Sequence, residues 1–345
     1  MNLNKIILPN YKETKSDLIC LRGKVNTGTA CNYRCGFCYY KDRLDVPDKP
    51  FINIQKEINN LYSNGIREFD LSGGESSIHK DFFKIIKYGN EFGSVTTLSN
   101  GYKFADYEFL KESYDNGLSG ILFSLHGWDS HSHDTKVGFK NAFDLIIKAI
   151  YNVKKLKEQL DCDFELRINC TVNEMIDCRS YAKLILDIEP DQLNILPINY
   201  WEDAISNKKI NYELVGSRIR YLIDLIVDRI KSQIDINVRY MPLCFAKGFE
   251  KYIVNIYQHI FDLKDWNLQL YDNNIQTRNK KTTKENMFLT ASNNRKNSFT
   301  KPSSCSACKY LYICDGIENK LLEHHELIPI TGKKIKDINY LKDIK

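Results

Sequence analysis

The chain has 345 residues, of which 49 are Lys or Arg and 44 are Asp or Glu, so the net charge is only +5. This charge is too small to indicate a nucleic-acid partner, and no apolar run is long enough to span a bilayer. Residues 1–17 lack the apolar core of a signal peptide, so we expect a cytoplasmic protein in which the clustered ones among its eleven cysteines bind metal instead of forming disulfides.

Between Leu21 and Tyr240, short runs with strand character alternate with longer runs of helical periodicity. The predicted strands are Arg22–Asn26, Glu68–Ser72, Val95–Ser99, Ile121–Leu125, Phe164–Val172 and Gln192–Pro197, and a further run, Ile234–Tyr240, leads out of this region. The predicted helices are Ile54–Ser63, Asp81–Glu91, Asp106–Tyr114, Phe139–Lys157, Ser180–Ile188 and Tyr212–Ser232. The alternation predicts an α/β fold of parallel strands with crossover helices, with six repeats where a closed barrel needs eight.

Three cysteines follow the first predicted strand at C-x3-C-x2-C spacing: Cys31, Cys35 and Cys38. Thiolates are soft ligands that favour iron–sulfur clusters or zinc. A [4Fe–4S] cluster normally takes four cysteines, and the next cysteine here is the distant Cys162. One iron would therefore stay open to a small molecule. The alternatives to a cluster are a zinc knuckle or three ordinary buried cysteines.

This motif resembles that of the radical S-adenosylmethionine (radical SAM) enzymes. The resemblance implies that the open iron binds the amino and carboxylate groups of S-adenosylmethionine, which is then cleaved to methionine and a 5′-deoxyadenosyl radical. It also implies a reductant such as flavodoxin or ferredoxin, and a partial (β/α)6 barrel whose active site lies at the C-terminal strand ends. Phe37 and Tyr39 match the aromatic residues that the family carries around the third cysteine, beside the adenine.

Polar groups also follow the next three predicted strands. After the second come Gly73, Gly74 and Glu75, where glycines let the backbone approach a ligand and a carboxylate can receive an ammonium group. This turn resembles the family motif that holds the amino group of the cofactor. Asn100 follows the third strand, either in a plain turn or at a position that contacts the cofactor. Ser124 matches a family position that often touches the cofactor ribose.

In the fifth predicted strand, polar and apolar residues alternate, so the apolar set should face the helices and the polar set the lumen. Arg167 and Asn169 then point inward, and Cys170 is a packing residue. Arg167 is a candidate for binding the cofactor carboxylate or a substrate anion, with a solvated arginine at the rim as the alternative.

The segment from His126 to Asp134 contains three histidines. His126 and Asp134 are candidates for orienting the substrate or transferring a proton, and we favour this over a separate metal site. Cys178 is the candidate hydrogen donor if the reaction is an epimerisation, because it follows the fifth strand by a short loop. Cys20 is a remote second choice, and Cys162 lies at the wrong end of the barrel.

A second group of cysteines, Cys305, Cys308 and Cys314, has C-x2-C-x5-C spacing. It resembles the C-terminal auxiliary-cluster modules of radical SAM enzymes, the SPASM/Twitch group, but Cys314 is the last cysteine where the full pattern continues. An auxiliary [4Fe–4S] cluster therefore needs a fourth ligand, and Cys244 is the best candidate because it lies where the chain leaves the barrel. A zinc ribbon is the alternative.

Three regions are predicted: an extension over 1–20, the barrel over 21–240, and a small irregular auxiliary-cluster domain over 241–345. The last includes a polar basic loop near 272–301, where seven basic residues from Arg278 to Lys301 face one acid, Glu285. We favour a solvated loop over a mobile lid that attracts an acidic substrate.

The leading hypothesis is a radical SAM enzyme that oxidatively modifies a ribosomally made peptide, because an auxiliary cluster can accept an electron from the substrate or bind its thiolate. A dehydrogenase or epimerase for a sugar, alcohol or other small molecule is a close rival, since few residues precede the cluster loop to form a peptide-recognition domain. Nucleic-acid modification is third and rests only on the basic loop. A non-catalytic iron–sulfur or zinc binding module is the alternative from a different class.

Overall fold

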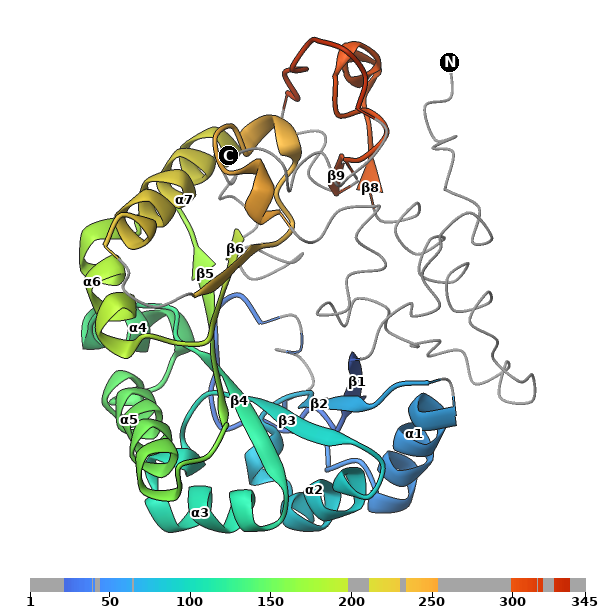
Figure 1. Ribbon diagram of the computed structural model, residues 1–345, viewed down its shortest axis with the longest axis vertical. Helices are drawn as coiled ribbons and strands as arrows, with labels where there is room; N and C mark the ends of the chain where they lie inside the picture. Colours follow the sequence, from blue (N-terminus) through green and yellow to red (C-terminus); the bar gives the residue numbers. More distant parts are fainter. Residues whose placement is uncertain are drawn as a thin grey trace.

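The computed structural model describes residues 22–38, 40, 44–63, 65–197, 211–229, 234–253, 299–314, 316–318 and 326–335. Seven parallel strands form one sheet in which neighbours in sequence are neighbours in space. The sheet is curled, and the helices cover its convex outer face (Figure 1). Because β1 (Arg22–Asn26) and β7 (Asp235–Val238) are the two edges, the barrel is open, as the prediction of a partial barrel requires.

The elements between these edges follow the predicted alternation. The other strands of the sheet are β2 (Glu68–Ser72), β3 (Ser94–Ser99), β4 (Leu118–Ser124), β5 (Glu165–Val172) and β6 (Gln192–Pro197). The helices are α1 (Phe51–Ser63), α2 (Phe82–Asn90), α3 (Tyr107–Asp115), α4 (Ser130–Val137), α5 (Ala142–Leu160), α6 (Cys178–Ile188) and α7 (Tyr212–Val227). Single 3-10 turns are η2 (Ser76–Ile78), η3 (Lys103–Ala105), η4 (Leu243–Phe245), η5 (Glu250–Tyr252) and η8 (Ser303–Ala307).

Two elements differ from the sequence-based expectation. The run predicted to lead out of the barrel is β7, which pairs with β6 from Gln192↔Asp235 onward, so the sheet has seven strands where six repeats were predicted. Helix α4 is missing from the predicted helices because its sequence, SHSHDTKV, has no apolar stripe. Its ends are specified by polar groups instead: Asp129 and Ser132 form a capping box, and Gly138 ends the helix in the left-handed conformation.

The two faces of the sheet have opposite character, as the alternation in each strand predicts. Fully buried apolar side chains, such as Phe69, Ile121 and Ile168, pack outward against the helices. The residues between them face the lumen and are largely polar; Asp70, Thr96 and Arg167 contact one another there across three strands. The polar lumen with its open rim is therefore where chemistry can take place.

The C-terminal part packs on the same apolar core as the barrel, through residues that include Tyr310 and Ile313. It contains a short antiparallel pair, β8 (Phe299–Thr300) and β9 (Ile317–Glu318). The Tyr310 hydroxyl lies 3.1 Å from Oε1 of Glu250, which connects this part to the segment that leaves the barrel. The extension over 1–20 and nearly all of the basic loop near 272–301 lie outside the described residues.

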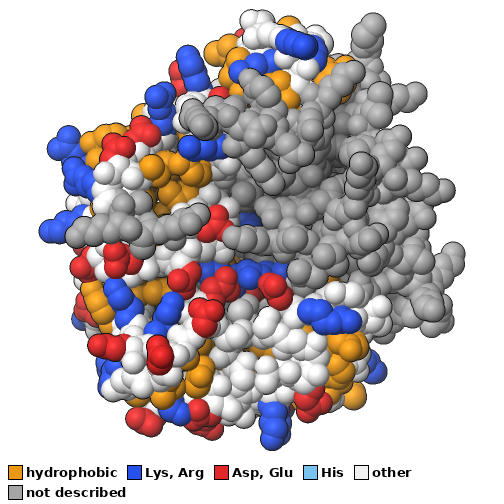
Figure 2. Space-filling view, viewed as in Figure 1, with side chains coloured by type: hydrophobic (Ala, Val, Ile, Leu, Met, Phe, Trp, Pro, Cys, Tyr) orange, Lys and Arg blue, Asp and Glu red, His pale blue; other side chains and the backbone are white. Residues whose placement is uncertain are grey.

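The described surface agrees with the small net charge. On the face shown in Figure 2, acidic and basic side chains are interspersed over the helices instead of gathering by sign. In the ranges that the structure describes, no helix has both the length and the apolarity needed to cross a membrane.

Candidate iron–sulfur and cofactor sites

The cluster loop, Cys31–Cys38, follows β1 and brings its three thiols close together. Burial, and then the neighbouring thiols Cys31 and Cys38, raise the pKa of Cys35 to about 12. Backbone N–H groups two residues on donate to the sulfurs of Cys31 (3.4 Å) and Cys38 (3.3 Å), which favours the thiolate. Without a cation these crowded thiols stay protonated, whereas the amides directed at sulfur favour the thiolate form that would hold a metal cluster.

One side of the cluster loop rests on the Gly73-Gly74-Glu75 turn. The amides of Gly74 and Glu75 donate to the carbonyls of Gly28 (3.0 Å) and Ala30 (2.8 Å). A Cβ on Gly73 would lie 2.0 Å from the Gly28 oxygen, and one on Gly74 would lie 2.0 Å from the Ala30 oxygen. The two glycines let another part of the molecule come close, as predicted. We expected a ligand there, but among the described residues the segment that comes close is the backbone leading into the cluster loop.

The Glu75 carboxylate joins the ends of β2 and β3. It is 4% exposed, and it accepts hydrogen bonds from the Ser99 hydroxyl (2.9 Å), the Asn100 amide (2.6 Å), and the amide and hydroxyl of Ser77. Burial raises its pKa, and these donors offset part of that rise. The prediction that Glu75 binds the ammonium group of the cofactor stays a prediction. The carboxylate also holds the ends of β2 and β3 together.

Asn100 connects the end of β3 to the cluster loop. Its side-chain Nδ2 donates to Oδ1 of Asn32 at 2.8 Å, next to Cys31. The Nδ2 of Asn32 is buried and has no hydrogen-bond partner among the described residues. A buried donor without a partner costs free energy, and a cluster sulfide would relieve that cost. Sequence reasoning missed Asn32, although its place directly after a ligand cysteine is a usable signal.

The other side of the cluster loop rests on the end of α4. The amides of Arg34 and Gly36 donate to the carbonyls of Val137 and Lys136, each at 3.1 Å. Tyr33 is buried and stacks on Phe139, with ring centroids 4.3 Å apart. The end of α4 and the residues just after it, which follow the predicted histidine-containing segment, therefore support the cluster loop.

His126 and His133 form a buried pair beside this loop. His126 Nδ1 accepts from the Thr171 amide (3.2 Å), and its own amide donates to His133 Nδ1 (3.1 Å). Each neutral ring therefore carries its proton on Nε2. Burial holds the pKa of His126 well below its usual value and lowers that of His133 to about 4. The Phe37 ring packs edge-on to His126 at 4.9 Å, so a neutral His126 helps to orient Phe37.

Two predicted catalytic candidates are wrong in their placement. The Asp134 carboxylate accepts from the amides of Asn141 (2.7 Å) and Phe143 (2.9 Å), so it holds the start of α5. The Cys178 thiol is buried and donates to the Arg218 carbonyl of α7 at 3.4 Å. Cys178 follows β5 as predicted, but it begins α6, and α6 buries its thiol against α7 instead of presenting it to the lumen.

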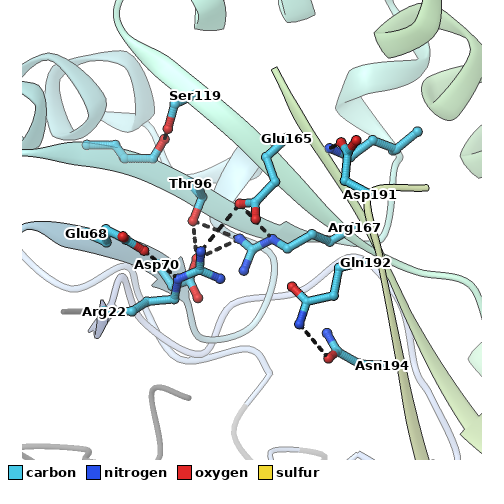
Figure 3. Close-up of polar contacts among 12 residues, drawn as sticks. Arg22, Glu68, Asp70, Thr96, Ser119, Glu165, Arg167, Asp191, Gln192 and Asn194 are labelled. Carbon is cyan, nitrogen blue, oxygen red and sulfur yellow. Dashed lines mark hydrogen bonds and ion pairs between the residues drawn. The ribbon is translucent and has the colours of Figure 1, made fainter. Parts of the chain in front are cut away.

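Arg167 points into the lumen as predicted, but into its closed part. Its guanidinium pairs with Asp70 at 2.8 Å and with Glu165 at 3.2 Å, and it is 1% exposed (Figure 3). Burial would raise the pKa of Asp70, but the charges of Arg167 and Arg22 outweigh burial and lower it to about 2. We therefore correct the assignment of Arg167 as a cofactor or substrate ligand: it neutralises the barrel interior below the rim.

The remaining lumen candidates lie at the rim. Ser124 ends β4 and is the register partner of Asn169 on β5, and both side chains are half-buried. Cys170 faces the helices and is fully buried, as predicted for a packing residue. Tyr39 and Cys20 lie outside the described residues.

The auxiliary site unites four cysteines from three segments: Cys244, Cys305, Cys308 and Cys314 line one cavity. Burial raises the pKa of Cys244, and the other three thiols raise it further. The Gly316 amide donates to the Cys314 sulfur at 3.3 Å, the same amide-to-sulfur pattern as in the cluster loop. Cys244, predicted from its position at the barrel exit, is thus at the cavity.

Both thiol groups supply soft sulfur ligands, which suit iron–sulfur clusters and zinc. Within the described ranges, no three His, Cys, Asp or Glu side chains are placed to hold one metal ion.

Comparisons with known proteins agree with this chemistry. Residues 25–162 match the family model of the Radical SAM superfamily. The chain is 22% identical to the PqqA peptide cyclase of Bradyrhizobium diazoefficiens over 211 residues, which are 60% of this chain and 54% of that protein. It is 25% identical to the GTP 3′,8-cyclase of Psychromonas ingrahamii over 198 residues, 52% of this chain and 56% of that protein.

Among solved structures, Streptococcus suis SuiB bound to precursor peptide SuiA aligns with a TM-score of 0.61 at 15% identity, covering 91% of this chain and 75% of SuiB. At that identity the likeness shows the fold alone. The chain spans about half the length of the curated relatives that it matches.

Proposed function

Because this chain carries a domain of the radical SAM superfamily, we propose that it cleaves S-adenosylmethionine reductively and uses the 5′-deoxyadenosyl radical to oxidise a peptide. The family implies a [4Fe–4S] cluster with S-adenosylmethionine. One observation carries the proposal: three cysteines in one loop are fixed between the Gly73-Gly74-Glu75 turn and the end of α4, at the C-terminal ends of the strands.

Different residues of the rim would hold the iron–sulfur cluster and S-adenosylmethionine. Cys31, Cys35 and Cys38 would hold the cluster, which, when bound and reduced, supplies the electron that cleaves S-adenosylmethionine. The Gly74–Glu75 turn would hold the methionine part of the cofactor. Phe37, kept in place by the His126 ring, would pack on the adenine. Ser124 and Asn169 would contact the ribose or the substrate from neighbouring strands.

The closed lower lumen supports this function by limiting where the radical can react. Arg22, Asp70, Glu165 and Arg167 fill it with paired charges, so a substrate can approach only from the rim. These charge pairs would keep a radical formed at the rim from reaching the opposite end of the barrel. Such a site suits abstraction of one hydrogen atom from a substrate held across the strand ends.

A second [4Fe–4S] cluster at Cys244, Cys305, Cys308 and Cys314 is part of the proposal. With four protein ligands, this cluster would have no iron left for a substrate thiolate, so its role would be to accept an electron. Electron removal together with hydrogen abstraction gives a product that lacks two hydrogens. A flavodoxin or ferredoxin would supply the electron for cofactor cleavage.

Two of the comparisons favour a peptide substrate, since one relative is a peptide cyclase and one structural neighbour holds a precursor peptide. The likeness to a GTP 3′,8-cyclase supports the rival class of small molecules. Epimerisation loses support, because the Cys178 thiol is buried between helices. The nucleic-acid alternative rests on a loop outside the described residues.

Isotope transfer tests the proposal. Anaerobically reconstituted protein is incubated with S-adenosylmethionine, reductant and perdeuterated short peptides encoded beside its gene. We expect 5′-deoxyadenosine that carries deuterium, and a peptide that has lost two hydrogens. The Cys31/Cys35/Cys38→Ala protein is the control and should give neither. Iron-loaded protein that makes no 5′-deoxyadenosine would overturn the function; deuterium only from labelled sugars or nucleotides would replace the peptide by the rival class.

A further inference from the structure

A lysine lines the auxiliary cavity together with the four cysteines. Lys301 is 7% exposed, although lysine is almost never fully buried without a partner or a purpose. Its side chain lines the same cavity as Cys305, Cys308 and Cys314. A fixed cation therefore adjoins a site built from four potential anions.

The chain holds the ammonium group of this lysine in place and leaves room for its stem. The ammonium group donates to the Leu311 carbonyl at 2.7 Å, and Leu311 also lines the cavity. The stem runs beside Gly316, where a Cβ would lie 2.9 Å from Lys301 Cγ and 2.1 Å from the Thr300 oxygen. Gly316, two residues after Cys314, therefore leaves room for the lysine stem. Its own φ is positive, at 90°.

We propose that Lys301 raises the reduction potential of the cluster held by Cys244, Cys305, Cys308 and Cys314, and so makes this cluster the electron acceptor of the reaction. The inference rests on the function proposed above. Reduction adds one negative charge to a cluster ligated by four thiolates, and a buried cation stabilises the reduced form more than the oxidised form. Net charge and exposure are among the main determinants of such potentials.

The electron count of the reaction needs such an acceptor. The 5′-deoxyadenosyl radical takes one hydrogen atom from the substrate and becomes 5′-deoxyadenosine. The remaining substrate radical would then give one electron to a cluster held by the four cysteines and one proton to water, which completes the loss of two hydrogens. A higher reduction potential of that cluster would make the electron transfer more favourable.

Redox titration of full-length protein tests the proposal. The Cys31/Cys35/Cys38→Ala background leaves only the auxiliary cluster, whose signal is followed by electron paramagnetic resonance. Lys301→Gln removes the charge but can still donate to the Leu311 carbonyl, and we expect its reduction equilibrium constant to fall at least tenfold, which is 59 mV for one electron. Lys301→Arg should stay near the parent value. Lys333→Gln, an exposed lysine of the same part of the chain, is the matched control and should change nothing.

The outcomes separate the inference from the proposed function. Iron at the auxiliary site with an unchanged potential in Lys301→Gln overturns the role of Lys301 alone. Loss of iron in both Lys301→Gln and Lys301→Arg also overturns it, because the lysine is then structural. Zinc in place of iron overturns both the auxiliary cluster and the inference, while deuterium transfer by the parent protein still tests the radical chemistry.

Discussion

The two sulfur sites of this protein are built in opposite ways. The cluster loop places three half-buried cysteines within one continuous stretch, and its backbone hydrogen bonds to a glycine turn and to the end of α4. The auxiliary site gathers four cysteines from separate segments around one cavity, with Cys305 and Cys308 buried. Three ligands leave an iron available to a cofactor, while four do not, so on the function proposed above the first site would carry the chemistry and the second would accept electrons.

The largest expected effect comes from removing the cluster loop's ligands. Reconstituted parent protein should hold about eight irons if both sites carry [4Fe–4S] clusters. Cys31/Cys35/Cys38→Ala should keep about half of this iron and lose all cleavage of S-adenosylmethionine, because the remaining cluster has no open iron. Iron analysis and chromatography of 5′-deoxyadenosine measure both quantities. Cofactor cleavage by the triple variant would end the distinction between the two sites.

The next effect concerns the predicted fourth ligand. Cys244→Ala should lose the auxiliary cluster's iron or hold a damaged cluster, and keep the iron of the cluster loop. Cys170→Ala is the matched control, because Cys170 is fully buried but packs against the helices. Iron content and resonance spectra of the two variants decide the assignment. A Cys244→Ala protein with a full, unaltered auxiliary cluster would mean that the fourth ligand comes from elsewhere.

Sequence alone specified the barrel well because strand alternation and helical periodicity are local signals. β1, β2 and β6 begin and end at the predicted residues, and the other strands of the first six differ only at their ends. The seventh strand was underestimated, because a run that leaves a barrel and a run that completes its sheet have the same alternation. Helix α4 could be found only from its caps, Asp129 and Gly138, since it buries little apolar surface.

The site was harder to predict, because direction and partner are not local properties. The position of Cys244 at the barrel exit suggested it as a partner of Cys305, and the two line one cavity, whereas face alternation placed Arg167 in the lumen but could not give its depth or its pairing with Asp70. Asp134 and Cys178 looked available because their partners, Asn141 and Arg218, come from elements that meet them only in the folded chain. Lys301, in turn, looked like one member of a basic loop.

Glu75 sharpens the comparison, since its turn supports one sulfur site and not the other. Glu75→Gln replaces a buried carboxylate by an amide whose NH2 group would face a donor, the amide of Asn100. The loss of a charge-assisted hydrogen bond, worth roughly 1.5–3 kcal/mol, should lower the affinity for S-adenosylmethionine about tenfold or more, with iron content unchanged. Calorimetry under anaerobic conditions measures it, and Ser77→Ala, which removes one neutral donor, should have a smaller effect. Unaltered affinity in Glu75→Gln would mean that the assignment of the turn is wrong.

The smallest effect tests the support that α4 gives to the cluster loop. Phe139→Leu keeps an apolar side chain but removes the stack on Tyr33, which as an aromatic pair contributes roughly 0.5–1.5 kcal/mol. We expect the cluster loop to open several-fold more often, so that a chelator removes its iron several-fold faster, while the auxiliary iron leaves at the parent rate and serves as an internal control. Phe92→Leu removes a comparable aromatic contact just before β3 begins, at the opposite end of the barrel, and should change neither rate. Equal acceleration at both sites would show that Phe139 stabilises the protein as a whole and that α4 is no specific support for the loop.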